Sequence, residues 1–188
     1  MESVEKNILT SCAPTILGVK QATLFSCPIA EARECSMTLL AYETLFRQKD
    51  IYFKPLYRCK NRLFIIAYRK SVLQNTLLKQ NISAYLETIG YPSSKTTPTE
   101  EMLSYLGKRI RSTGSFPHEI GFFLGYPEED VFGFIKYKGD NYKLCGYWKV
   151  YGNAEKAKDL FCKISKSYHI VQNIISSEAS FKTILGAA

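Results

Sequence analysis

Hydrophobic and polar positions recur along the chain with two different periods, which predicts both helices and strands. Apolar residues spaced three and four apart indicate helices over residues 29–47, 72–89, 99–113, 127–137 and 153–168. Runs rich in β-branched and aromatic residues indicate strands over residues 51–57, 62–68, 119–126 and 142–151. This order of elements predicts an α/β or α+β fold: a single domain with a mixed four-stranded sheet covered by helices.

The first two expected strands are close enough to form a β-hairpin. Residues 58–61, Arg-Cys-Lys-Asn, separate them and are typical of a turn. Pro55 places the first strand at an edge of the sheet, because proline cannot donate a ladder hydrogen bond. The nearly continuous apolar run over residues 62–68 indicates that the second strand is central.

The most distinctive segment, residues 116–127, reads FPHEIGFFLGYP. Its expected strand, residues 119–126, would have Ile120, Phe122, Leu124 and Tyr126 on one face and Gly121, Phe123 and Gly125 on the other. Glycines on one face leave room for close approach by a helix, another backbone or a ligand. With the helix and the strand that follow, this segment could form a right-handed parallel crossover.

The two ends of the chain are less clearly patterned. Residues 1–27 are expected to be irregular or partly helical, because prolines interrupt them. Residues 1–168 are expected to form the domain, and residues 169–188 a C-terminal extension that is partly helical or frayed.

The composition of the chain favours a packed protein in the cytoplasm. Of the 188 residues, 46% are hydrophobic and 22% are charged, which suits a globular core. No apolar run is long enough to span a membrane, and the N-terminus does not resemble a secretory signal. The six cysteines form no Cys-x-x-Cys pair, so we expect reduced thiols and no metal site.

Positive charge is concentrated in one stretch of the chain. The formal net charge is +8, and residues 51–86 contain no Asp or Glu. The cations of this stretch are Lys54, Arg58, Lys60, Arg62, Arg69, Lys70 and Lys79. Such a stretch attracts nucleic acid, a phosphorylated cofactor or an acidic partner, unless acidic residues from elsewhere fold against it.

Candidate chemistry centres on one histidine, since the chain has no glycine-rich phosphate-binding motif. His118 could act as a general base, as an axial ligand to a haem iron, or only as a hydrogen-bonding residue of its loop. Cys12 or Cys145 could supply a nucleophilic thiol beside it. Tyr147 and Trp148 could stack on a planar cofactor or base, or pack in the sheet.

Three segments resemble an uncharacterised family, domain of unknown function 3793, that is common in anaerobic Firmicutes of the clostridial type. They are APTILGVK (residues 13–20, with Leu24 and Phe25 after it), FPHEIGFFLGYPEEDVFGFI (residues 116–135) and GYWKVYG (residues 146–152). The resemblance covers nearly the whole chain. It implies a fold unit and a class of organism, but no reaction and no catalytic residue.

Three functional hypotheses follow. The first is a cytoplasmic protein that binds an anionic small molecule or a cofactor of unknown identity at the His118 end of residues 116–127. Its expected contacts are Lys20, Arg69, His118, Tyr147, Trp148 and Lys149. The second is an enzyme, a transferase or a thiol-dependent catalyst, that uses His118. The third, which we favour less, is a nucleic-acid-binding accessory protein that uses the basic stretch from Lys54 to Lys79.

Overall fold

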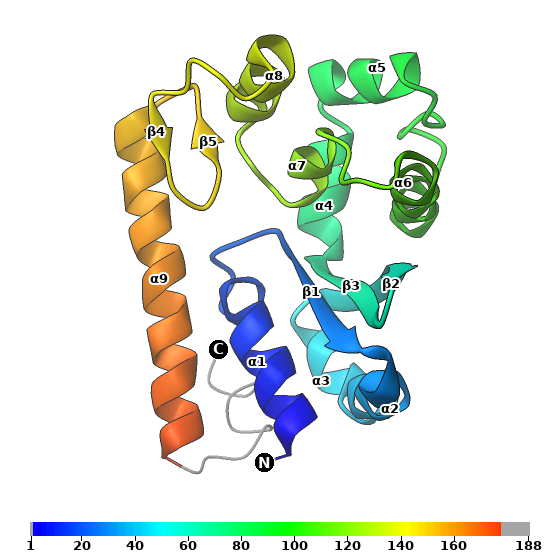
Figure 1. Ribbon diagram of the computed structural model, residues 1–188, viewed down its shortest axis with the longest axis vertical. Helices are drawn as coiled ribbons and strands as arrows, with labels where there is room; N and C mark the ends of the chain where they lie inside the picture. The colour runs from blue at the N-terminus through cyan, green and yellow to red at the C-terminus, as the bar shows by residue number, and fades with distance from the viewer. Residues whose placement is uncertain (1, 178–188) are drawn as a thin grey trace.

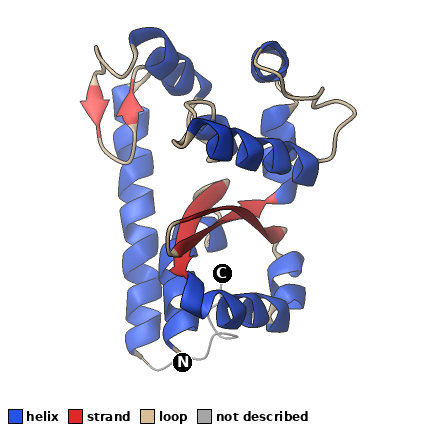
Figure 2. Cartoon of the chain, turned by 45° about the vertical axis from the view of Figure 1, so that its right-hand side comes forward, coloured by secondary structure: helices blue, strands red, loops and turns tan. Residues whose placement is uncertain are grey.

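A three-stranded antiparallel sheet lies in the middle of the molecule, between two layers of helices (Figures 1 and 2). The structure, a computed structural model, describes residues 2–177. In the sheet the strand order is β1 (Ala22–Pro28), β3 (Arg62–Arg69), β2 (Ile51–Cys59). The remaining strands, β4 (Leu144–Cys145) and β5 (Lys149–Val150), form a separate two-stranded hairpin. The fold is therefore α+β.

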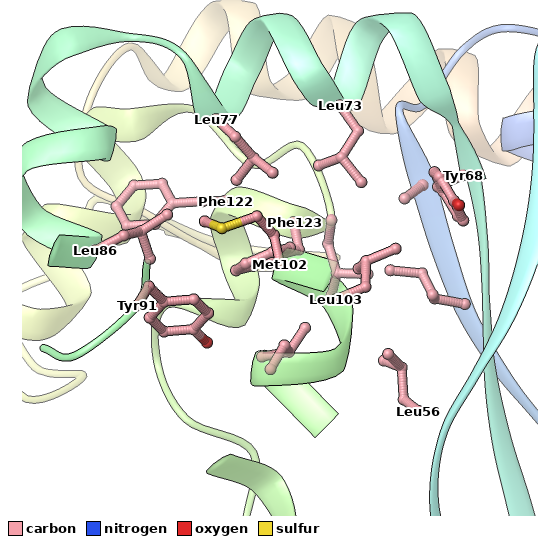
Figure 3. Close-up of a cluster of buried hydrophobic side chains, with 14 of the residues drawn as sticks. Leu56, Tyr68, Leu73, Leu77, Leu86, Tyr91, Met102, Leu103, Phe122 and Phe123 are labelled. Carbon is pink, nitrogen blue, oxygen red and sulfur yellow. The ribbon is translucent and has the colours of Figure 1, made fainter. Parts of the chain in front are cut away.

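The helices divide between the two faces of the sheet because residues of the central strand alternate between the faces. One face is covered by α1 (Ser3–Ile16), the 3-10 turn η1 (Ile29–Glu31), α2 (Ala32–Ala41) and α3 (Glu43–Gln48). The other face is covered by α4 (Lys70–Leu77), α5 (Gln80–Thr88), α6 (Thr99–Thr113), α7 (Ile120–Phe123) and α8 (Glu128–Tyr137). Ile65 and Ala67 of β3 point into the first core, and Ile66 and Tyr68 into the second. Figure 3 shows the second core, where Leu103, Phe122 and Phe123 meet the residues of α4 and α5.

The predicted hairpin of β2 and β3 is confirmed, with β2 at the edge and β3 in the centre. A register shift between Pro55 and Tyr57 marks a bulge in β2. Helix α6 crosses close to this bulge: a Cβ on Gly107 would lie only 2.5 Å from the Leu56 carbonyl oxygen. The same oxygen accepts a 3.0 Å hydrogen bond from Nη1 of Arg111, which ties α6 to the hairpin.

The strand predicted over residues 119–126 is wrong, because this segment forms the short helix α7. A short apolar run does not distinguish a buried strand from a buried helix by its period alone. Gly125 follows the helix with φ of +76°, a conformation that favours glycine. The close approach expected at Gly121 does occur: its Cβ would lie 2.7 Å from Cγ2 of Val131, so the glycine lets α7 pack on α8.

The single strand predicted over residues 142–151 is also wrong, since the chain folds back on itself there. Backbone hydrogen bonds from Lys143 to Val150 and from Gly146 to Trp148 close the small β4–β5 hairpin. The two small sheets replace the expected mixed four-stranded sheet, and no parallel crossover is present among residues 2–177. Residues 1–27, expected to be irregular or partly helical, contain α1 and also the strand β1, which was missed.

Helix α9 (Ala154–Ser176) runs the length of the molecule, from the β4–β5 hairpin to the side of α1 (Figure 1). The Asn153 side chain caps the N-terminus of this helix by accepting a hydrogen bond from the Lys156 N–H. Residues 169–176 continue this helix, and Val171 is buried against the α1 core. Residues 178–188 lie outside the described residues, so the proposed domain boundary stays a prediction. No helix within residues 2–177 combines the length and the apolar character needed to cross a bilayer.

Candidate functional site

A pocket of 340 Å³ opens between the segment before α7, helix α8 and the β4–β5 hairpin. The segments that form its walls are far apart in the sequence but meet because α7 packs on α8 and α8 packs on β5. Its lining residues are mainly apolar and aromatic: Phe116, Pro117, His118, Ile120, Gly121, Tyr126, Asp130, Val131, Phe134, Cys145, Tyr147, Trp148 and Lys149.

The indole of Trp148 forms part of the pocket wall and is fixed on three sides. Its ring stacks on Tyr126 with centroids 4.7 Å apart and meets the edge of Phe161 at 4.5 Å. Its Nε1 donates a 2.7 Å hydrogen bond to Oδ2 of Asp130. Only 8% of the residue is exposed, whereas the neighbouring Tyr147 is 46% exposed at the pocket rim. Of the two aromatic residues, Tyr147 is therefore the one with ring surface free for a ligand.

The carboxylate of Asp130 joins α8 to the hairpin, although it is almost completely buried. Its Oδ1 accepts hydrogen bonds from the backbone N–H groups of Tyr151 at 2.7 Å and Gly152 at 2.8 Å. Together with the indole N–H of Trp148, three donors compensate the buried negative charge. Asp130 thus positions the pocket wall, and these bonds occupy three of the roughly four lone-pair sites of its carboxylate.

His118 lies at the pocket with its ring nitrogens available. The imidazole meets the edge of the Phe134 ring at 4.9 Å, and neither nitrogen has a hydrogen-bond partner within residues 2–177. The adjacent Glu119 points elsewhere: it is buried and forms an ion pair with Arg109. The two neighbours therefore do not act as a His–Glu pair, and His118 is not holding its own loop by a side-chain hydrogen bond.

Lys149 supplies the cationic group of the pocket. Its Nζ donates a 2.7 Å hydrogen bond to the Gly139 carbonyl oxygen and lies 4.8 Å from the centroid of the Tyr142 ring. In the described part of the chain no carboxylate pairs with it. Because an ammonium group has three N–H donors, two remain for a bound anion.

Lys20 and Arg69 are near this region but do not line the pocket. Nζ of Lys20 lies 5.3 Å from the centroid of the Tyr126 ring, and burial lowers the pKa of Lys20 to about 8. Nη1 of Arg69 would lie 3.1 Å from a Cβ on Gly18, so its guanidinium packs on the loop after α1. Lys20 therefore contacts one residue of the pocket wall, Tyr126, whereas Arg69 contacts the loop after α1.

The two candidate thiols have different surroundings. Cys12 is fully buried in the core below the sheet, and burial raises its pKa far above the usual range. It does not share a pocket with His118, so the structure does not form the Cys12–His118 pair. Cys145, in contrast, is exposed and lines the same pocket as His118.

The chain matches the model of a protein family described as "Protein of unknown function (DUF3793)" over residues 8–185. The chain belongs to this family. Comparison with curated proteins and with solved structures found no match.

In this DUF3793 chain, two of the segments that carry the sequence resemblance form the pocket. With the exception of Cys145, every lining residue lies within residues 116–135 or 146–152. Sequence reasoning identified His118, Tyr147, Trp148 and Lys149, and the structure brings these four together.

The pocket residues that sequence reasoning missed are chiefly Phe116, Phe134 and Asp130. Phe116 and Phe134 both lie within residues 116–135, but the direction of each side chain depends on the path of the chain through the segment before α7 and through α8. Asp130 reads in the sequence only as one of three acids that open a helix. Its contact with Trp148 joins residues 18 positions apart, and no local pattern indicates it.

Proposed function

We propose that the pocket binds a small planar organic anion, with its ring against the aromatic wall and its carboxylate or phosphate at His118 and Lys149. The observation that carries this proposal is the combination of two side chains. Both His118 and Lys149 line a mainly apolar pocket, and neither is paired with a carboxylate within residues 2–177. Apolar pockets with few convergent polar groups are typical of small-molecule sites.

The aromatic residues support a ring-containing ligand. Phe134 contacts both His118 and Lys149, which places the two polar groups around one apolar ring. Tyr147 and Phe116, both partly exposed, lie at the rim, where they could cover the ligand. The pocket volume of 340 Å³ is near the lower end of known ligand sites, which favours a ligand of one or two rings.

The charges of the pocket are compatible with an anion despite the presence of Asp130. Its carboxylate already accepts three N–H hydrogen bonds, two of them from backbone groups, which offset its charge. Lys149 lies on the strand next to these groups and adds a positive charge. The ammonium of Lys149 is therefore the charged group of the lining that can pair with an anion held near His118.

The proposal is tested by thermal unfolding with a defined ligand panel: benzoate, indole-3-acetate, adenosine monophosphate, flavin mononucleotide and haem. A ligand at about 100 times its dissociation constant should stabilise the native state by about 2.7 kcal/mol. For a panel member that binds, Lys149→Met and His118→Gln should each weaken binding at least tenfold in calorimetry. Lys163→Met, at an exposed position on α9, is the matched control and should bind as the wild type does. The proposal fails if no panel member binds, or if both pocket variants retain full affinity.

A thiol-dependent enzyme is the second candidate, because Cys145 and His118 line the same pocket. An imidazole that assists a thiol should make Cys145 react faster than an ordinary exposed thiol. The exposed Cys59 and Cys162 serve as internal controls in the same protein. Iodoacetamide labelling followed by peptide mass spectrometry should show Cys145 labelled first, and His118→Gln should remove the difference. Equal labelling rates for the three thiols would contradict this candidate.

We also propose a cytoplasmic location. All six cysteines are free, and three of them are exposed. Thiols of this kind persist in a reducing compartment, whereas oxidising compartments favour disulfides.

A further inference from the structure

The tip of the β2–β3 hairpin and the end of α6 together present four exposed cations, which we call the basic hairpin surface. Its members are Arg58, Lys60, Arg62 and Arg111. The hydrogen bond from Arg111 to the Leu56 carbonyl oxygen brings the fourth cation from α6 to the hairpin. The residues are exposed because they lie at a turn and at a helix end, beyond the two cores.

Acidic residues from elsewhere in the described chain do not neutralise this surface. Of the cations in the acid-free stretch, Lys70 forms an ion pair, with Glu100 at 2.8 Å. Within residues 2–177 no member of the basic hairpin surface forms one. Arg62 binds only neutral groups, the hydroxyl and the carbonyl oxygen of Ser26. The positive charge is therefore available to an external anion.

An aromatic cluster lies directly beside these cations. Tyr57 and Phe64 face each other across the hairpin and stack with centroids 4.5 Å apart. Phe116 packs edgewise on both, at 5.5 Å and 5.9 Å, and is 42% exposed. On this face of the hairpin the exposed ring of Phe116 thus lies beside the strand that carries Arg62, whereas Arg58, paired with Leu63, is on the opposite face.

We propose that the basic hairpin surface, together with Phe116, binds single-stranded nucleic acid. The phosphates would contact the cations, and a base would stack on the exposed part of the Phe116 ring. Single strands combine a regularly charged backbone with free base faces, which is the chemistry that cations beside an exposed aromatic ring recognise. A duplex hides its base faces, and an acidic peptide has none, so neither uses the aromatic surface. This inference does not depend on the ligand of the neighbouring pocket.

The test uses the full chain and a fluorescent single-stranded RNA of about 20 nucleotides, with a DNA strand of the same sequence as a second probe. The logarithm of the association constant should fall linearly with the logarithm of the salt concentration, with a slope of about −2.8 if four phosphates are contacted. The triple variant Arg58→Gln/Lys60→Gln/Arg62→Gln should bind at least tenfold more weakly at about 0.1 M salt, with a slope less steep by about 2. Phe116→Ala should weaken binding at least fivefold while leaving the slope unchanged, because stacking involves no charge.

A matched control removes the same number of positive charges from α9, which lies away from the β2–β3 hairpin (Figure 1). It is the triple variant Lys156→Gln/Lys163→Gln/Lys166→Gln, at three exposed positions of that helix. This control should bind within twofold of the wild type. The proposal is overturned if neither single strand binds at low salt, or if the α9 control loses as much affinity as the hairpin variant. It is also overturned if a duplex of the same sequence binds more tightly, or if poly-glutamate displaces the RNA at equal charge concentration. The hairpin triple variant should still bind any pocket ligand normally, which separates this result from a failure of the pocket proposal.

Discussion

Asp130 and Trp148 are joined by a 2.7 Å hydrogen bond from the indole Nε1 to Oδ2 of the carboxylate. The other carboxylate oxygen binds the backbone of Tyr151 and Gly152, so one side chain holds both the pocket wall and the chain that leads into α9. Val150 and Trp148 then pack in a small core with α9. Because this core is small, the shape of the pocket depends on polar contacts to an unusual degree.

Replacing Asp130 by Asn should destabilise the protein and loosen the pocket. An amide keeps the volume but has one oxygen and one N–H₂ group, so it cannot accept all three hydrogen bonds. Hydrogen bonds to a charged group contribute more than neutral ones, and we expect a loss of about 3 kcal/mol in the free energy of unfolding. Urea unfolding measures this loss, and the fluorescence of Trp148, the sole tryptophan, reports on the local change. Glu129→Gln, at the exposed neighbouring position, should cost less than about 1 kcal/mol. Equal effects of the two substitutions would show that Asp130 contributes only helix-terminal charge.

Tyr151→Phe should leave stability unchanged or increase it. The Tyr151 hydroxyl is buried and has no hydrogen-bond partner in the described chain. Its ring packs tightly on Gly133 and stacks on Tyr137 at 5.8 Å, contacts that phenylalanine retains. Removing an unpaired buried hydroxyl should therefore add from 0 to about 1 kcal/mol to the free energy of unfolding. A loss greater than about 1 kcal/mol would show that the hydroxyl has a partner.

Gln21→Leu should destabilise the protein through α7. The Gln21 amide donates to the carbonyl oxygens of Phe122 at 2.9 Å and Phe123 at 3.0 Å, two buried groups at the end of this short helix. A leucine removes this donor from both carbonyls, but the Phe122 carbonyl keeps its 3.3 Å bond from the Gly125 N–H, so unfolding should require about 2 kcal/mol less free energy. The matched substitution Gln74→Leu, at an exposed position on α4, should change the free energy of unfolding by less than about 0.5 kcal/mol. Chemical denaturation of the two variants in parallel would reveal whether Gln21 has this role.

These contacts also explain why the sequence predicts some elements correctly and others wrongly. The β2–β3 hairpin is predictable because its strands, its turn and the position of Pro55 all depend on local sequence. The helix α7 is not, because its last carbonyls are satisfied by Gln21, about a hundred residues earlier in the chain. Without that partner in view, the short apolar and aromatic run of residues 119–126 favours a strand.

The candidate site could be predicted only in part, because its residues also meet through contacts between distant parts of the chain. His118 and Trp148 stand out because the chain has two histidines and one tryptophan, and Tyr147 and Lys149 are the neighbours of Trp148 in a distinctive segment. Only their charge favours Lys20 and Arg69 as ligand contacts, and charge does not determine which surface a side chain reaches. The bend at Gly146 turns Lys149 back toward His118, a step that the prediction of one continuous strand missed.

Lys20 should make stability depend on pH in the alkaline range. Burial lowers the pKa of Lys20 from 10.5 to about 8, so the folded protein releases this proton at a lower pH than the unfolded chain does. Between about pH 8 and 10.5 the unfolded state binds more protons, and the contribution of Lys20 to the free energy of unfolding therefore rises with pH. Below pH 8 the charged side chain is a cost to the folded state, and Lys20→Met should remove that cost.

At pH 7 Lys20→Met should therefore be more stable than the wild type by on the order of 2 kcal/mol, allowing for the lost contact with the Tyr126 ring. This advantage should shrink as the pH rises from 7 to 9.5, because the wild type gains stability in that window and the variant does not. Urea unfolding of both proteins across the series measures the difference, in which the titration of all other groups cancels. The free energy of unfolding of Lys163→Met, at an exposed position, should differ from that of the wild type by the same small amount at every pH. A Lys20→Met advantage that stays constant over this range would mean that the Lys20 pKa is ordinary and that its ammonium is well solvated in the folded protein.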